Sequence, residues 1–173
     1  RDRGTESSEF HIVFVGKYTP LHGIPIMMRA AKMLEDLPAI RFHFIGSGQL
    51  SEEVHQLYNS LGLQNVTFSE WIDYQDLPAL LSNADLCLGI VGTTEKAGRV
   101  IPGKVFWALA LGTPVLTGDS SAARELLTDK QDALLCQRGD PESMSDAIRM
   151  AFYDRDLLKR VGDGGRRTYL ARA

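Results

Sequence analysis

One stretch of the sequence decides the fold class: Arg99-Val-Ile-Pro-Gly-Lys-Val-Phe-Trp-Ala-Leu-Ala-Leu-Gly-Thr-Pro-Val-Leu116. It predicts a polar loop, then a helix that opens with Pro102 and Gly103 and stops at Gly112, and then a buried strand. Proline at the first helical position and glycine just past the end are the expected punctuation of a helix. Lys104 falls in the first helical turn, beside free N–H groups and the positive end of the helix dipole. The stretch therefore also predicts a site for an anion, with a phosphate or diphosphate as the expected ligand.

The rest of the chain alternates short apolar runs with amphipathic segments, which is the pattern of strands alternating with helices. The predicted strands cover residues 10–15, 40–45, 66–68, 86–91, 113–117 and 133–136. Helices are expected between them, with Ser51, Asp73 and Asp140 as N-caps, and a last helical segment from Arg155 onward is expected to be interrupted by glycines 162, 164 and 165. The run 86–91 is apolar on both faces, as in a central parallel strand. The predicted fold class is therefore α/β, a doubly wound, Rossmann-like parallel sheet of about six strands with helices on both faces.

Length and composition fit one globular domain. The chain has 173 residues, of which 44% are hydrophobic and 24% charged, with a formal net charge of −3, and these values are ordinary for such a domain. We expect residues 10–173 to form the domain and residues 1–9 to be the remnant of a linker from a larger protein. The charge balance argues against nucleic acid as a partner, and no apolar run is long enough to span a membrane. Cys87 and Cys136 are expected to be buried reduced thiols, and the histidine spacing predicts no metal site.

Four loops are predicted to leave strands at the carboxyl edge of the sheet, where open α/β sheets bind their ligands. They are residues 16–23, 46–48, 70–73 and 92–104. In the first, Lys17 and His22 could hold the two ends of a diphosphate, or could be a surface lysine and a capping histidine. In the third, Trp71 could form one wall of a base-binding slot, or could be a packing residue at a strand end.

Two phosphate-binding motifs are matched only in part. Gly46-Ser-Gly48 follows a strand, but Ser51 stands where a dinucleotide fingerprint requires its third glycine, so a nicotinamide cofactor is not expected. The two glycines still permit close backbone approach to a ligand, with a plain turn as the alternative. Gly98-Arg-Val-Ile-Pro-Gly-Lys104 has the spacing of a P-loop, but Val105 cannot ligate magnesium as the motif's Ser or Thr does. An NTPase is therefore not expected, whereas a phosphate at the helix N-terminus is.

Taken together, these segments resemble one known family over about Phe10 to the C-terminus. The residues that carry the resemblance are Val15-Gly-Lys-Tyr-Thr-Pro-Leu-His-Gly23, Phe44-Ile-Gly-Ser-Gly48, Val66-Thr-Phe68 with Trp71-Ile72, Ala84-Asp-Leu-Cys-Leu88, Ala108-Leu-Ala-Leu-Gly-Thr-Pro-Val115 and Glu125-Leu-Leu127. In combination they resemble the C-terminal, donor-binding half of GT-B glycosyltransferases. The group is the large retaining one (group 1, family 4) that includes sucrose and mannosyl transferases.

The resemblance implies which residues hold the donor. The family's first-loop Arg and Lys, which contact the donor diphosphate, fall on Lys17 and His22, so the contribution of His22 would depend on its protonation near its ordinary pKa. The implied donor site comprises Gly16, Lys17, His22, Gly46, Ser47, Trp71, Ile72, Arg99, Val100, Ile101, Pro102, Gly103 and Lys104.

The chain departs from the family where that family carries a pair of glutamates. The Glu-x7-Glu element, which serves the sugar and the ribose, is replaced by Arg99 and Trp107. Ile101-Pro-Gly-Lys-Val105 instead resembles the I-P-x-K-V element of some branches. On that basis we expect the backbone from Val100 to Gly103, together with Lys104, to serve the diphosphate.

The resemblance implies the donor-binding domain of a retaining, metal-independent enzyme of glycan biosynthesis, one half of a GT-B fold. Its donor would be a nucleoside-diphosphate sugar such as a UDP- or GDP-sugar, with no other cofactor. An N-terminal domain of the parent protein would bind a glycan or lipid-linked acceptor, and the chain alone would be inactive. We expect a cytoplasmic parent protein, with the inner face of the membrane as a further location. The alternatives are a non-catalytic nucleotide-binding or partner module and a GT-B nucleotide-sugar 2-epimerase, and no catalytic residue is assigned from the sequence.

Overall fold

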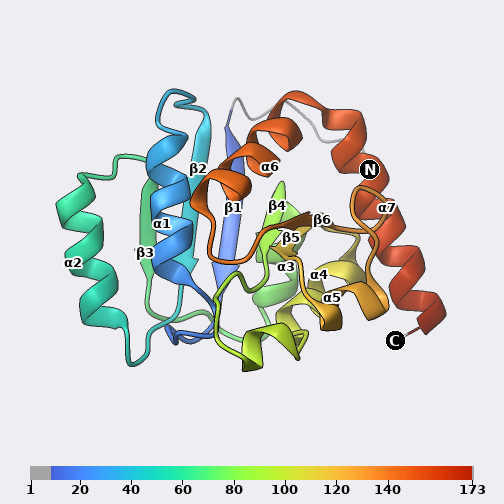
Figure 1. Cartoon of the computed structure of the whole chain (residues 1–173). Helices are drawn as coiled ribbons and strands as arrows, with labels where there is room; N and C mark the ends of the chain where they lie inside the picture. Colours follow the sequence, from blue (N-terminus) through green and yellow to red (C-terminus); the bar gives the residue numbers. More distant parts are fainter. Residues whose placement is uncertain (1–8, 173) are drawn as a thin grey trace.

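The computed structural model describes residues 9–172, which form a single open parallel sheet covered by helices on both faces (Figure 1). Apart from Glu9, the predicted linker remnant lies outside the described residues. The strands are β1 (Phe10–Val15), β2 (Ile40–Ile45), β3 (Val66–Ser69), β4 (Leu86–Leu88), β5 (Val115–Gly118) and β6 (Leu134–Cys136). Their order is β3-β2-β1-β4-β5-β6, with every pairing parallel. This is the order of a doubly wound Rossmann sheet, so the predicted fold class is confirmed.

The connections between strands are helical. They are α1 (Ile24–Met33), α2 (Ser51–Leu61), α3 (Leu77–Asn83), the 3-10 turn η1 (Lys96–Gly98), α4 (Gly103–Leu111), α5 (Ser121–Leu126), α6 (Pro141–Tyr153) and α7 (Arg155–Arg172). In Figure 1, α1 and α6 lie in front of the sheet and α3 and α4 behind it. Within the described part of the chain, no helix combines the length and the apolar character that a membrane crossing requires.

Side-chain alternation along the strands divides the core between the two faces. Ile12 and Phe14 of β1 pack with α1 and α6 on one face, whereas Val13 packs with α4 on the other. Residues at alternate positions of a strand point to opposite faces, so a strand buried on both faces must be apolar throughout. Cys87 and Cys136 are buried free thiols, as predicted, and burial raises the pKa of each to about 12.

Helix ends agree only partly with the sequence prediction. Gly112 ends α4 in the left-handed conformation, and Asp140 caps α6 through hydrogen bonds from the backbone N–H groups of residues 142 and 143. Pro102, however, is the N-cap residue of α4 rather than its first helical residue. Ser51 begins α2 instead of capping it, because its hydroxyl accepts a hydrogen bond from the N–H of Gly48 at 2.9 Å.

The cap predicted at Asp73 is also wrong. Helix α3 begins later, with Asp76 at the N-cap position, and the Asp73 side chain accepts a hydrogen bond from the Trp71 indole instead.

Helix α7 is continuous, so the predicted interruption by glycines is wrong. Gly162, Gly164 and Gly165 are all buried. A Cβ at Gly162 would overlap the carbonyl oxygen of Gly112, and one at Gly164 would overlap that of Gln131. The glycines therefore let α7 pack directly against backbone, and this packing outweighs their low helix propensity.

Candidate functional site

A cavity of about 640 Å³ opens at the carboxyl edge of the sheet, next to the loop that follows β1. Lys17 and His22 line it from that loop, and Pro102 and Lys104 line it from the start of α4. Strands β1 and β4 are neighbours and parallel, so the loops that follow them meet at one edge. Residues more than 80 positions apart in the sequence therefore share one cavity.

Lys104 is the most unusual residue of this cavity. Its ammonium nitrogen is buried, has no hydrogen-bond partner among the described residues, and lies 3.7 Å from the centroid of the Phe14 ring. Burial lowers the pKa of Lys104 well below its ordinary value of 10.5. An unpaired buried ammonium is unfavourable unless an anion compensates it. An anionic ligand in the cavity would therefore stabilise this lysine in its charged form.

The space around this nitrogen depends on a glycine. A Cβ at Gly16 would lie 3.1 Å from Lys104 Nζ. Gly16 itself is approached from the other side by the next loop, because a Cβ at Gly46, whose φ is +137°, would overlap the Gly16 carbonyl oxygen. The two glycines thus allow two loops and a lysine to converge.

His22 is largely shielded from solvent, at 9% exposed. Its Nδ1 shares a hydrogen bond of 3.2 Å with the Thr19 hydroxyl, and its ring meets Phe14 edge to face at 5.3 Å. Burial, and then the charge of Lys104, lower the pKa of His22 to about 4. The expectation that His22 titrates near its ordinary pKa is therefore wrong, and in the unliganded chain the ring is neutral at neutral pH.

A second cavity, of about 380 Å³, lies on the other side of Lys17. The two cavities share Val15, Gly16 and Lys17. The second is bounded by Gly46 and Ser47 after β2 and by the segment after β3, including Glu70, Trp71, Ile72 and Tyr74. A ligand with a charged centre and a flat end could thus place its charge near Lys17 and its flat end in the second cavity.

Trp71 is 78% exposed, so the alternative that it is an ordinary packing residue is wrong. Its indole N–H donates to Asp73 at 3.3 Å, which orients the ring. Tyr74 is 69% exposed and meets Trp107 edge to face at 5.4 Å. The rim of the second cavity is therefore aromatic.

The structure brings many of the predicted donor-site residues together, but not all. Those that line the two cavities are Gly16, Lys17, His22, Gly46, Ser47, Trp71, Ile72, Pro102 and Lys104. The predicted residues outside both linings are Arg99, Val100, Ile101 and Gly103. Arg99 forms an exposed ion pair with Glu95, and Ile101 packs against the core beside α4. Gly103 is the exposed first residue of α4.

The structure adds cavity-lining residues that the sequence analysis did not single out. Thr19, Pro20, Leu21, Thr94 and Lys96 line the first cavity. Glu70, Tyr74 and Leu77 contribute to the second, together with Val15 and Ile45. Lys96 could have been predicted from one feature of the sequence, because it is a second cation in the polar segment that leads to Lys104.

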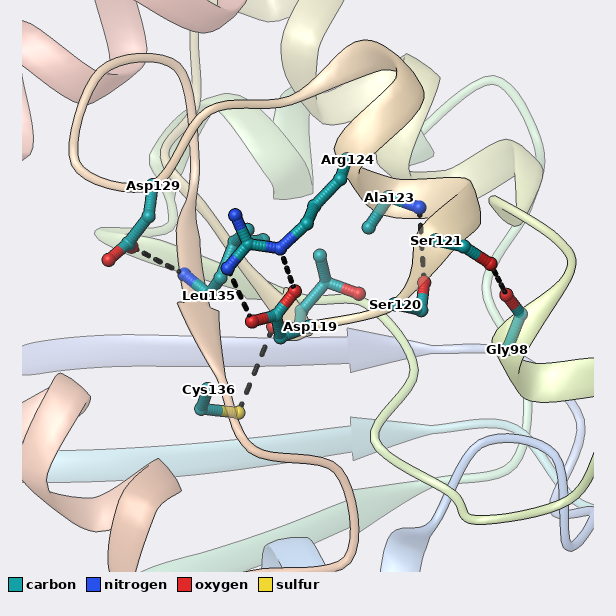
Figure 2. Close-up of polar contacts among 10 residues, drawn as sticks. Gly98, Asp119, Ser120, Ser121, Ala123, Arg124, Asp129, Leu135 and Cys136 are labelled. Carbon is teal, nitrogen blue, oxygen red and sulfur yellow. Dashed lines mark hydrogen bonds and ion pairs between the residues drawn. The ribbon is translucent and has the colours of Figure 1, made fainter.

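The segment from Gly92 to Gly98, which presents Thr94 and Lys96, is held by contacts from the next two loops. An Arg138 guanidinium nitrogen lies 3.4 Å from the Gly92 carbonyl oxygen and 3.3 Å from that of Thr94. Figure 2 shows the Ser121 hydroxyl donating to the Gly98 carbonyl oxygen, at 3.1 Å. These bonds fix the wall of the first cavity.

Asp119, the first residue after β5 at the carboxyl edge of the sheet, is already paired with Arg124. Figure 2 shows the Arg124 guanidinium donating to both of its oxygens, at 2.6 and 2.7 Å. This pairing lowers the pKa of Asp119. Within residues 9–172, no group of three or more His, Cys, Asp or Glu side chains is arranged to hold a metal ion.

Comparison with known proteins identifies the family. The family model of the group 1 glycosyl transferases matches residues 9–154. The chain belongs to this family. The predicted resemblance to the donor-binding half of a GT-B glycosyltransferase is thereby confirmed.

Relatives of known name are at least about twice as long as this chain. Lipopolysaccharide core biosynthesis glycosyltransferase LpsD of Rhizobium meliloti is 27% identical over 172 residues, which are 99% of this chain and 47% of LpsD. A chitobiosyldiphosphodolichol beta-mannosyltransferase of Candida albicans is 27% identical over 154 residues, which are 85% of this chain and 33% of the relative. The chain thus spans about half the length, or less, of these relatives.

Solved structures share the fold at lower identity. The C-terminal domain of a group 1 family glycosyl transferase, LpcC from Francisella tularensis, has a TM-score of 0.80 and 19% identity, and the match covers 94% of this chain and 85% of that domain. HepE from Anabaena, in complex with UDP, has a TM-score of 0.84 and 19% identity, with 95% of this chain and 45% of HepE covered. The architecture is therefore that of a GT-B C-terminal domain.

Proposed function

We propose that this chain binds the nucleoside-diphosphate sugar donor of a retaining glycosyltransferase. The single observation that carries the proposal is the Lys104 ammonium, buried without a partner at the wall of a cavity on the carboxyl edge of the sheet. A diphosphate would supply the missing counter-charge. HepE structures with UDP and with UDP-glucose support a nucleotide-sugar ligand for this fold.

In the proposed complex the diphosphate lies between Lys104 and Lys17, the sugar lies in the first cavity, and the base lies in the second. Lys17 is exposed and belongs to both linings, so it can follow the diphosphate across their junction. His22 would donate a hydrogen bond to the diphosphate and would gain a proton more readily once that anion is present.

The chemical contribution of these residues is electrostatic. Transfer breaks the bond between the sugar and the diphosphate, and negative charge grows on the departing diphosphate oxygens. Cations and N–H donors already fixed around those oxygens stabilise that charge without reorganising during the reaction. Under this proposal the two lysines serve the role for which other enzymes use a metal ion.

The acceptor, a glycan or lipid-linked molecule, would be bound by an N-terminal domain of the parent protein. Because this chain spans about half the length of its relatives, the proposed active site is a cleft between two domains. The isolated chain should then bind the donor weakly and should not transfer the sugar. Robust transfer by the 173 residues alone would contradict this part of the proposal.

Isothermal titration of the chain with UDP and with GDP tests the site. We expect Lys104→Met and Lys17→Ala each to weaken binding at least about tenfold, because each removes a charged hydrogen bond to the ligand. Lys159→Met is the matched control, since Lys159 is exposed and lies by the cavity at the opposite edge of the sheet. Unchanged affinity in both site variants would refute the assignment.

A non-catalytic nucleotide-binding module stays open as the second candidate. It is favoured by Arg99 and Trp107, which stand where the family has glutamates. Neither side chain carries a carboxylate, and both have other partners: Arg99 is paired with Glu95, and Trp107 packs against Tyr74. Nucleotide binding by this chain, with or without transfer by the full-length protein, separates the two candidates. A 2-epimerase is not proposed, because it needs paired carboxylates and Glu70 is the only carboxylate among the described residues that line either cavity.

A further inference from the structure

The second cavity contains one carboxylate among groups that carry no negative charge. Glu70 is the first residue after β3 and lines this cavity beside the exposed ring of Trp71. Its side chain forms no hydrogen bond or ion pair with any other residue in the part of the chain that the structure describes. The remaining lining consists of Lys17, aromatic and aliphatic side chains, and the loop residues Gly16, Gly46 and Ser47. Glu70 is therefore free to bind a ligand group.

The position of Glu70 is set by backbone bonds on both sides of the cavity. The N–H of Gly46 donates to the Ser69 carbonyl oxygen at 2.8 Å, and the N–H of Gly16 donates to that of Ile45 at 3.0 Å. These bonds tie together the loops that follow β1, β2 and β3. Because Glu70, Trp71 and Lys17 line the same cavity, a base placed against Trp71 would share that cavity with Glu70, and its diphosphate could extend past Lys17.

The walls of this cavity suit a flat heteroaromatic ring. Aromatic side chains stack on any nucleobase and do so with little regard to its identity. Selection among bases must therefore come from the polar edge of the cavity. An ionised carboxylate offers two oxygen acceptors and no donor, and it binds best a pair of adjacent N–H donors.

Guanine is the common base that presents such a pair. Its N1–H and N2 amino group lie side by side and match the two oxygens of a carboxylate. Uracil presents a single N3–H between two carbonyl oxygens, so a carboxylate that accepts this hydrogen faces oxygen lone pairs on both sides. Adenine and cytosine present one amino group next to an unprotonated ring nitrogen. The acceptor-only edge thus favours guanine over the other three.

We propose that Glu70 is a specificity-determining residue that selects guanine, so that the donor is a guanosine-diphosphate sugar. This inference rests on the proposed function, because it places a nucleotide base in the second cavity. It goes beyond that function by assigning the base.

Calorimetric titration of the 173-residue chain with GDP, IDP and UDP tests the assignment. IDP is the informative ligand, because it keeps N1–H and lacks only the 2-amino group of GDP. We expect GDP to bind at least about tenfold more tightly than either IDP or UDP, since losing one partner of a charged hydrogen bond costs about that factor. UDP binding equal to or tighter than GDP binding would overturn the inference, and so would equal binding of GDP and IDP.

Glu70→Gln gives the second comparison. The amide replaces one acceptor by a donor, so GDP affinity should fall at least about tenfold, while UDP affinity should stay at or above that of wild type because the amide N–H can donate to a uracil carbonyl oxygen. Glu53→Gln is the matched control, because Glu53 is exposed on α2 and lines neither cavity. An equal fall for both nucleotides would overturn the role of Glu70. If the variant fails to fold, the wild-type comparison of GDP with IDP still decides.

Failure of the proposed function has a different signature. In that case Lys104→Met and Lys17→Ala both leave the affinity for every nucleotide unchanged, or no nucleoside diphosphate binds at all. If instead Lys104→Met abolishes binding but the wild-type chain prefers UDP, the donor site stands and the selection of guanine by Glu70 is refuted.

Discussion

Lys104→Met should raise the stability of the unliganded chain while it abolishes donor binding. The Lys104 ammonium is buried, lacks a hydrogen-bond partner and lies 3.7 Å from the Phe14 ring centroid. An uncompensated buried charge costs about 3–4 kcal/mol, and a desolvated cation–π contact returns about 2 kcal/mol. Methionine keeps most of the apolar stem, so the free energy of unfolding should rise by about 1–2 kcal/mol. For a chain of this length that corresponds to an increase in Tm of about 2–8 °C.

The pH dependence of this gain provides an independent check. The pKa of Lys104 is lower in the folded chain than its ordinary value of 10.5. Below pH 10.5 the unfolded chain therefore holds this proton more tightly, and the penalty in wild type shrinks as pH rises toward that value. Urea denaturation of wild type and Lys104→Met at pH 7, 8.5 and 10 should show the stability gap narrowing. A variant that is less stable than wild type, or a gap that stays constant with pH, would refute the reasoning.

Three further predictions concern the fold and His22. The pKa of His22 falls from 6.5 to about 4 on folding, so between these pH values the unfolded chain binds more protons and stability is lost as the pH falls. In His22→Gln the midpoint urea concentration should therefore decrease less between pH 6.5 and pH 4 than it does in wild type. Parallel curves of midpoint against pH for the two proteins would contradict this. Gly164→Ala should destabilise the chain by about 2–4 kcal/mol in urea denaturation, because its Cβ would overlap the Gln131 carbonyl oxygen. This loss should outweigh alanine's higher helix propensity. A gain in stability would show that α7 can move away from Gln131 without loss. Gly103→Ala should be neutral or stabilising by up to about 1 kcal/mol, because no atom lies within 4 Å of the added Cβ. A clear loss of stability in the same assay would show that neighbouring atoms crowd the start of α4.

The sequence was sufficient to predict the sheet, because each strand is a short, mainly apolar run in which polar side chains such as Arg41 and His43 are the exception. Helix ends were less predictable. Ser51 and Asp73 have the right residue types for caps, but their oxygens accept hydrogen bonds from Gly48 and Trp71 instead. Local chemistry alone cannot decide between such partners.

Helix α7 shows a second limit. Three glycines within four residues indicate a broken helix by propensity, yet the helix is continuous because those glycines meet backbone from distant segments. Nothing near α7 in the sequence shows that Gly112 and Gln131 will pack against it.

The candidate site was predictable where residue type and motif agreed, as for Lys17, His22 and Lys104. The lowered pKa of His22 was not, because it arises from burial and from Lys104, which is distant in sequence. Glu70 and Tyr74 also gave no usable signal, since the path of a loop decides which of its side chains face a cavity.

The central claim is that one nucleoside diphosphate occupies both cavities, with its phosphates at Lys104. Amide-resolved NMR titration of the 173-residue chain with GDP tests it most directly. We predict saturable shift changes confined to the loop at residues 16–23, to Gly46 and Ser47, to the segment after β3 and to the start of α4, and their loss in Lys104→Met. Shift changes at the opposite edge of the sheet, around Asp85, Gly112 and Lys159, or the same changes in Lys104→Met, would contradict the claim.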